Sequence, residues 1–122
     1  MGGGFGGERF KGTAGFKAEI NKLIESLPRN PDKLKKEGWK EITHPKIPRF
    51  TDGVAKHRQF VNEQTGLHAQ FDRAVPGAMG FKAIDHYHVK NTDSTSDEDF
   101  YLDKDGNPVA KGSSASHIIP RR

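Results

Sequence analysis

The sequence predicts an α+β fold, with N-terminal helices packed on a four- to five-stranded antiparallel sheet. Three observations favour this class. An apolar repeat with helical spacing is confined to the first third of the chain, the remainder is rich in short segments of strand character, and turn signals separate those segments closely. Helices followed by a run of hairpin-connected strands are typical of the α+β class.

The helical part of the chain lies before Gly38. Apolar residues recur every three or four positions until Pro28 interrupts the pattern, which predicts a helix over residues 14–26. An Asn-Pro pair then supplies a capping residue and a proline at the first helical position. We therefore expect a short second helix over residues 31–37.

The segments after Gly38 have strand character. Residues 63–66 form a turn signal between two of them, and an Asp-Gly pair at 105–106 is a strong signal for a further hairpin. The polar residues 91–98 are expected to form an exposed loop. The expected strand segments are 39–43, 57–62, 67–73, 81–90 (the longest), 100–103 and the residues from 109 onward.

Composition limits both the size of the core and the function. Of the 122 residues, 32% are hydrophobic and 30% are charged, which suits one domain with a small core. The formal net charge of +4 and an isoelectric point near 9.4 favour an acidic partner such as nucleic acid. The lack of cysteine excludes disulfides, cysteine-based zinc sites and thiol catalysis. No apolar run approaches the roughly 20 residues of a membrane span.

The first twelve residues differ in composition from the rest of the chain. Residues 1–12 are dominated by glycine and show no period, which predicts a flexible linker. The rest, residues 13–122, is expected to form a single folded domain. A glycine-rich start is compatible with a module tethered to a larger protein and equally with an ordinary chain terminus.

The sequence DHYHVKN, residues 85–91, is the strongest candidate for chemistry. Side chains alternate across a strand, so His86, His88 and Lys90 are expected on the face opposite Tyr87 and Val89. The segment 67–73 alternates in the same way. If the two strands are neighbours, His68 and Asp72 share the histidine-bearing face.

Three interpretations of these histidines remain open. Two imidazoles about 6–7 Å apart on a strand can flank a phosphate, one accepting a proton from an attacking hydroxyl and the other donating one to the leaving oxygen. Alternatively, both imidazoles bind one metal ion, with a third ligand from His68, Asp72 or His117. In the third interpretation they are polar residues on a solvated face without chemistry.

Other residues are weaker candidates. Lys40 lies at a basic strand end, and Arg58 follows a histidine at the start of a strand, so both are able to bind phosphate. Ser116 and His117 combine a hydroxyl donor with another base near the C-terminus. On spacing alone, solvent exposure is the default interpretation of each.

Four sequence segments resemble C-terminal toxin domains of bacterial polymorphic and contact-dependent growth inhibition systems. They are GWKEITHPK, RQFVNEQTGLHAQFD, PGAMGFKAIDHYHVKN and YLDKDGNPVAKGSSASHIIP, and the similarity covers roughly residues 27–120. Many such toxins are ribonucleases of the barnase, EndoU, colicin and RelE-like group, with an N-terminal helical part before a four- or five-stranded antiparallel sheet. A glutamate in the position that barnase-type enzymes use as base is not identified in this sequence.

The resemblance implies a secreted or surface-delivered endoribonuclease that acts in the cytoplasm of a target bacterium. It implies RNA as substrate, often tRNA, a larger delivery protein on the N-terminal side, and a cognate immunity protein, which we expect to be acidic. Cleavage is expected to use acid–base chemistry without a metal or other cofactor. The expected catalytic residues are His86, His88, Lys40 and His117, and the expected substrate-binding residues are Arg58, Lys90, His68 and Ser116.

Two alternatives to this function stay open. The same histidines would also suit a metal-dependent nuclease. A basic module that binds RNA without cutting it would need aromatic stacking platforms. Its only plausible platforms are Trp39, Tyr87 and Tyr101, and each is expected in the core.

Overall fold

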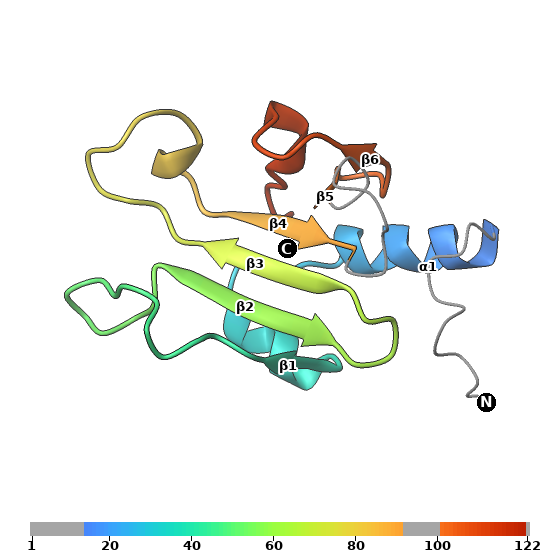
Figure 1. Ribbon diagram of the computed structural model, residues 1–122, viewed down its shortest axis with the longest axis horizontal. Helices are drawn as coiled ribbons and strands as arrows, with labels where there is room; N and C mark the ends of the chain where they lie inside the picture. The colour runs from blue at the N-terminus through green and yellow to red at the C-terminus, as the bar shows by residue number, and fades with distance from the viewer. Residues whose placement is uncertain (1–13, 92–100, 122) are drawn as a thin grey trace.

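The computed structural model describes residues 14–91 and 101–121, and it confirms the α+β class (Figure 1). A short helix precedes an antiparallel sheet, as the sequence predicts. The elements, in chain order, are α1 (Ala14–Glu25), the 3-10 helix η2 (Pro31–Lys36), β1 (Trp39–Glu41), β2 (His57–Asn62), β3 (His68–Asp72), the 3-10 helix η3 (Gly80–Ala83), β4 (His86–Lys90), β5 (Tyr101–Leu102), β6 (Pro108–Val109) and the 3-10 helix η5 (Ser114–Ser116).

The sheet has six strands in the order β1-β2-β3-β4-β5-β6, so each strand pairs with its neighbour in sequence. Four or five strands were expected, but all six segments of strand character join one sheet, because the residues on either side of the Asp-Gly turn pair as the edge strands β5 and β6. The carboxylate of Asp103 accepts hydrogen bonds from the backbone N–H groups of Asp105 and Asn107, both at 2.9 Å. Gly106 adopts φ +82°, which favours glycine in this turn.

The two N-terminal helices confirm the helical part of the prediction. α1 covers all but the last residue of the expected segment. The second helix is a 3-10 helix, and Asn30 caps it as expected, because the side-chain oxygen of Asn30 accepts the N–H of Asp32 at 3.0 Å. The expected linker over residues 1–12 and most of the loop over 91–98 lie outside the described residues.

One face of the sheet forms the core together with both helices. Phe60, Ala69, Tyr87 and Leu102 come from four adjacent strands and are 3% exposed or less. The hydroxyl of Tyr87 donates a hydrogen bond to the carbonyl of Pro28 at 2.7 Å, so this buried polar group is satisfied. The whole cluster comprises Ile20, Ile24, Leu27, Leu34, Trp39, Phe60, Leu67, Ala69, Phe71, Tyr87, Val89, Leu102 and Ile118.

The expected long strand over residues 81–90 is wrong in its first half. Strand β4 begins at His86, and the residues before it form η3 and an extended link. The turn is closed by a hydrogen bond from the N–H of Ile84 to the carbonyl of Phe81 at 3.1 Å. Alternation over residues 81–90 would place Asp85 on the same face as Tyr87, but Asp85 is exposed and accepts the N–H of Ala74 at 2.6 Å. The alternation from Tyr87 to Val89 holds, but it does not extend back to Phe81.

Candidate active site

The strand register gathers the polar residues of β2, β3 and β4 on the face opposite the core. His57, Asp72 and His86 lie opposite one another across three strands. One step along, Gln70 faces His88, and a further step along, His68 faces Lys90. The expected grouping of His68, Asp72, His86, His88 and Lys90 on one face is therefore confirmed.

The C-terminal segment brings a third histidine to this face. Ile118 pairs with Tyr87 through two backbone hydrogen bonds of 2.8 Å, so residues 117–119 lie beside the first half of β4. Ile118 is buried in the core, and its neighbour His117 points to the other side. The ring centroid of His117 lies 5.0 Å from that of His86 and 4.7 Å from that of His88.

Phe81 supports the third histidine instead of joining the core. Its ring is stacked on that of His117, with 4.0 Å between centroids and 13° between planes. It also contacts His86 edge-on at 6.2 Å. Phe81, which was expected to begin the long strand, thus forms one wall of the histidine cluster.

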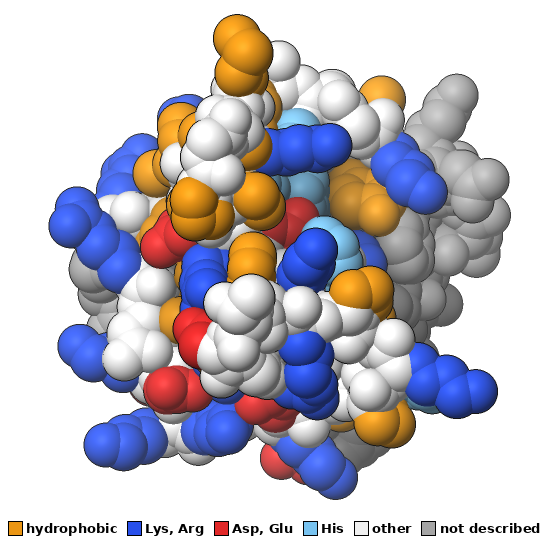
Figure 2. All heavy atoms as spheres, turned by 90° about the vertical axis from the view of Figure 1, so that its left-hand side faces the viewer, with side chains coloured by type: hydrophobic (Ala, Val, Ile, Leu, Met, Phe, Trp, Pro, Cys, Tyr) orange, Lys and Arg blue, Asp and Glu red, His pale blue; other side chains and the backbone are white. Residues whose placement is uncertain are grey.

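The histidines do not lie on an open sheet face. The side chains of His86, His88 and Asp72 are only 5%, 13% and 17% exposed, because Phe81 and His117 pack against this face. Figure 2 shows histidine side chains recessed in a hollow between hydrophobic and basic side chains. Partial burial of this kind strengthens electrostatic interactions within the site.

Asp72 lies at the centre of the cluster. One carboxylate oxygen, Oδ1, accepts hydrogen bonds from His57 Nδ1 at 2.8 Å and from Gln70 Nε2 at 2.9 Å. The other, Oδ2, lies 3.4 Å from His86 Nε2 and 3.5 Å from His88 Nε2. Burial opposes ionisation, but these contacts outweigh it and hold the pKa of Asp72 well below its usual range.

Both ring nitrogens of His86 face hydrogen-bond acceptors. Nδ1 lies 2.8 Å from the carbonyl oxygen of Ile84 and Nε2 faces the carboxylate of Asp72. A carbonyl and a carboxylate only accept, so the environment favours a proton on each nitrogen. Burial by itself lowers the pKa of His86, but the interactions with Asp72 and the Ile84 carbonyl outweigh it, and the pKa is raised.

His117 has the opposite environment. Its Nδ1 lies 2.9 Å from the carbonyl oxygen of Ser113, so this nitrogen carries the proton and Nε2 carries a lone pair. Burial and the nearby charge of His88 and His86 lower the pKa of His117. The pKa values of His86 and His117 are therefore shifted in opposite directions, with 5.0 Å between their ring centroids.

Lys90 supplies a cation beside the histidines. Its Nζ donates a hydrogen bond to Gln70 Oε1 at 2.9 Å and lies 5.8 Å from the centroid of the Tyr101 ring. Burial lowers the pKa of Lys90, with the charge of Asp72 acting in the opposite direction. His68 faces Lys90 on the next strand, and its pKa is lowered by burial and by the charge of Lys90.

Three expected site residues are not brought to the cluster. Lys40 is exposed on β1, three strands from β4, which is about 14 Å at a strand spacing of about 4.8 Å. Arg58 lies on the opposite face of the sheet, where it pairs with Glu41 at 2.9 Å and Asp32 at 2.8 Å. Ser116 is completely buried, and its hydroxyl donates to the carbonyl of Ser113 at 2.7 Å.

Sequence reasoning gave too little weight to Asp72 and His57. The alternation of residues 67–73 correctly predicts Asp72 on the same face as His68, but Asp72 was given a role only as a possible metal ligand, although it contacts three histidines. What the sequence does not contain is the register that sets Asp72 opposite His86.

A metal ion could be held by the three clustered histidines. Among the described residues, His86, His88 and His117 each offer one ligand atom, and these atoms all lie within 4.8 Å of one another. Neutral imidazoles are ordinary ligands of zinc and related ions. The third ligand that the metal interpretation requires is thus available from His117.

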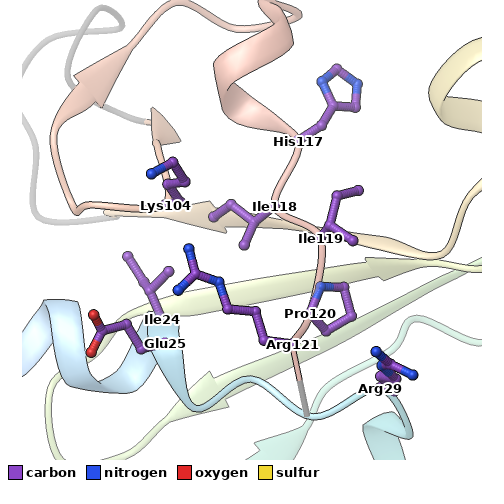
Figure 3. Close-up of a pocket in the computed structure, with 9 residues that line it drawn as sticks. All are labelled: Ile24, Glu25, Arg29, Lys104, His117, Ile118, Ile119, Pro120 and Arg121. Carbon is purple, nitrogen blue, oxygen red and sulfur yellow. The ribbon is translucent and has the colours of Figure 1, made fainter.

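A separate pocket of about 430 Å³ lies behind the C-terminal segment (Figure 3). Ile24 and Ile118 contribute apolar surface, and Arg29, Lys104 and Arg121 contribute positive charge. His117 lines the edge of this pocket, and in Figure 3 its ring points away from the other lining side chains.

Comparison with protein-family models, curated proteins and solved structures gave no match. Within residues 14–91 and 101–121, no helix combines the length and apolar character needed to cross a bilayer. The arrangement itself, two imidazoles of opposite character beside a carboxylate and a lysine, is suited to proton transfer at a phosphate ester.

Proposed function

We propose that this chain is an endoribonuclease that cleaves RNA by acid–base chemistry without a metal. The observation that carries the proposal is the pairing of His117 with His86. His117 has a lone pair at Nε2, whereas both nitrogens of His86 face acceptors. Two titratable groups whose environments differ in this way are suited to the base and acid roles of one reaction.

In the proposed reaction, His117 is the general base. Its Nε2 accepts the proton of a ribose 2′-hydroxyl, and the 2′-oxygen attacks the adjacent phosphorus. His86 is the general acid and donates the Nε2 proton to the departing 5′-oxygen. The products are a 2′,3′-cyclic phosphate and a free 5′-hydroxyl, and the base and acid exchange protonation states in the process.

The remaining polar residues stabilise charge and position the acid. Lys90 and His88 stabilise the negative charge that grows on the phosphorane oxygens. Asp72 keeps His86 oriented and protonated through its Oδ2, 3.4 Å from His86 Nε2. We move His88 from proton transfer to charge stabilisation because none of the described residues hydrogen-bonds its Nδ1, whereas both ring nitrogens of His86 face acceptors that favour the protonated form.

Tyr101 is suited to hold a nucleobase beside the scissile bond. Its ring meets His88 edge-on, at 6.0 Å between centroids, and it is only half-buried. The other two aromatic residues considered as stacking platforms, Trp39 and Tyr87, are 5% and 0% exposed in the core. Base stacking on one aromatic ring tolerates all four bases, so we expect weak sequence preference from this contact.

A metal-dependent nuclease is the second candidate, favoured by the three imidazole ligands within 4.8 Å. His86, His88 and His117 would hold the ion, which would supply an activated water as nucleophile, so that DNA would be cleaved as well as RNA. The acid–base mechanism requires the 2′-hydroxyl. Substrate choice and chelator sensitivity therefore separate the two functions.

We also propose the biological role that the resemblance to bacterial toxin domains implies. A ribonuclease of this kind would be delivered by a larger protein into a target bacterium, and its producer would need an immunity protein. An acidic immunity protein suits the net charge of +4. Co-expression with the product of the adjacent gene, followed by a growth assay, tests this role.

The activity is tested by incubating the purified chain with total RNA and with DNA, each with and without EDTA. We expect cleavage of RNA alone, unchanged by the chelator. Loss of cleavage in EDTA with recovery on adding zinc or manganese would favour the metal-dependent nuclease. Binding of RNA without cleavage would favour a non-catalytic RNA-binding module.

A further inference from the structure

We propose that the histidine cluster also binds a divalent transition metal ion of the zinc type, and that the bound ion switches off RNA cleavage. The cluster is defined by His86, His88, His117 and Asp72. The switching part of this inference rests on the proposed ribonuclease function. The binding part rests on the geometry of the four side chains alone.

The spacing of the three imidazoles fits one ion after small side-chain rotations. Their ligand atoms lie within 4.8 Å of one another. In a tetrahedral zinc site with bonds of about 2.0–2.1 Å, two ligand atoms are about 3.4 Å apart. Each ring therefore has to move by about an ångström or less toward a common centre.

The surroundings already orient two of the rings as ligands. The carbonyl oxygens of Ile84 and Ser113 accept the Nδ1 protons of His86 and His117, which directs Nε2 of each ring into the cluster. Backbone carbonyls commonly hold metal-bound histidines in this way. The Nδ1 atom of His88 is buried, and none of the described residues gives it a hydrogen bond.

Asp72 lies beside two of the three imidazole ligands and is the candidate for a fourth. Its Oδ2 lies 3.4 Å from His86 Nε2 and 3.5 Å from His88 Nε2, close to the separation of neighbouring ligands in a tetrahedral site. Its other oxygen is held by His57 and Gln70, which fixes the carboxylate. Of these four side chains, only the three imidazoles have ligand atoms within 4.8 Å of one another, so Asp72 would complete a four-coordinate shell after the ring of His117 moves toward it.

A filled coordination shell argues for inhibition instead of metal catalysis. A catalytic zinc ion keeps one position for water, and this site leaves none when Asp72 binds. The ion would also occupy Nε2 of His117, which the proposed base requires, and replace the proton on Nε2 of His86, which the proposed acid donates. Cleavage therefore stops while the ion is bound.

The binding part is tested without RNA. The full chain is treated with EDTA, dialysed, and titrated with Zn²⁺ by calorimetry and with Co²⁺ by visible absorption. We expect one ion per chain, the absorption of four-coordinate cobalt, and no binding of Mg²⁺, which prefers oxygen ligands. His117→Ala should weaken binding at least about tenfold, since loss of even a group that only orients a ligand has that effect.

His44→Ala is the matched control, because His44 is an exposed loop histidine outside the cluster, and it should bind the ion unchanged. Circular dichroism checks that each variant folds, and His88→Gln serves as a second ligand variant if His117→Ala is unfolded. Absence of binding would overturn the inference. So would binding that neither ligand variant weakens.

The switching part is tested by adding one equivalent of Zn²⁺ to the cleavage assay. We expect RNA cleavage to stop and to return with EDTA. A rise in cleavage on adding zinc would overturn the switch and favour the metal-dependent nuclease. If no RNA is cut under any condition, the proposed function and the switch fall together, while the titration still decides whether the metal site exists.

Discussion

The two faces of the sheet differ in the kind of side chain that they carry and in the interactions that hold those side chains in place. The core face is a set of apolar side chains from α1, η2 and every strand from β1 to β5, joined by residues such as Phe60 and Tyr87 that are 0% exposed. The histidine face carries a carboxylate, a lysine and imidazoles, partly covered by Phe81 and His117. Burial of apolar surface is favourable wherever it occurs, whereas a half-buried polar cluster depends on each partner. The first face should therefore determine stability and the second activity.

Removing a large side chain from the core face should have the largest effect. Phe60→Ala deletes a completely buried ring, and we expect a loss of about 3–5 kcal/mol in the free energy of unfolding. Urea denaturation followed by tryptophan fluorescence measures it, because Trp39 lies in the same cluster. A loss below about 1 kcal/mol would mean that this face is not the main source of stability.

Changing the proposed base should act on the reaction instead. We expect His117→Ala to lower the rate of RNA cleavage by about a hundredfold or more, which corresponds to about 2.7 kcal/mol in the activation free energy. His44→Ala is the control and should cleave at the original rate. Equal rates for the two variants at matched stability would remove His117 from the mechanism.

His86→Ala should also abolish most cleavage, but it should affect stability as well. An open sheet face would have made the change harmless to folding. His86 is 4% exposed and faces Asp72, so its removal leaves a cavity and a carboxylate with one partner fewer. Unfolding and cleavage are therefore measured separately for this variant, and full stability together with full activity would contradict its placement.

A smaller effect on stability is expected from the ion pair between Glu41 and Arg58, on the core side of the sheet. Hydrogen bonding to Arg58 is the main cause that lowers the pKa of Glu41 to about 2, with burial opposing it. The folded-state pKa is depressed, so the contribution is present above the ordinary pKa of 4.5 and is lost as the pH falls toward 2. We expect about 1 kcal/mol, since the pair is partly exposed.

The comparison is made between the original chain and Glu41→Gln. Their unfolding free energies should differ at pH 6 and converge as the pH falls toward 2, and their cleavage rates at neutral pH should agree. Asp72 titrates in both chains, so its contribution cancels in the difference. A difference that persists unchanged at pH 2 would show that ionisation of Glu41 is not the cause.

The smallest effect is expected at Lys40, which tests how far the active region extends. Lys40 is exposed and about 14 Å from β4. We expect Lys40→Ala to change the free energy of unfolding by less than about 0.5 kcal/mol. The activation free energy of RNA cleavage should change by a similarly small amount. Lys90→Ala, on the same face but beside His88, is the matched variant and should reduce cleavage strongly. A larger loss for Lys40→Ala than for Lys90→Ala would reverse the proposed roles.

Local sequence signals predicted much of the fold. The apolar repeat predicts α1, the Asn30 cap predicts the start of η2, and the Asp-Gly pair predicts the β5-β6 turn. Each of these depends on neighbours within a few residues. The segment before β4 was mispredicted because its alternating pattern continues back to Phe81, while packing against His117 and a local turn determine its conformation.

The candidate site was predicted only in part, for a related reason. Alternation correctly assigned His86, His88 and Lys90 to one face, since it requires only the strand itself. Asp72 and His117 join them through register and through the pairing of Ile118 with Tyr87, which are contacts between distant parts of the chain. No spacing rule within one strand contains that information.

The most direct test of the proposed activity is a DNA oligonucleotide that contains a single ribonucleotide. The acid–base mechanism predicts one cut, immediately 3′ of the ribose, in the presence of EDTA, leaving a 2′,3′-cyclic phosphate on the upstream fragment and a 5′-hydroxyl on the downstream one. Mass spectrometry identifies both ends. Cuts elsewhere in the oligonucleotide, or a 5′-phosphate at the cut, would contradict attack by the 2′-hydroxyl.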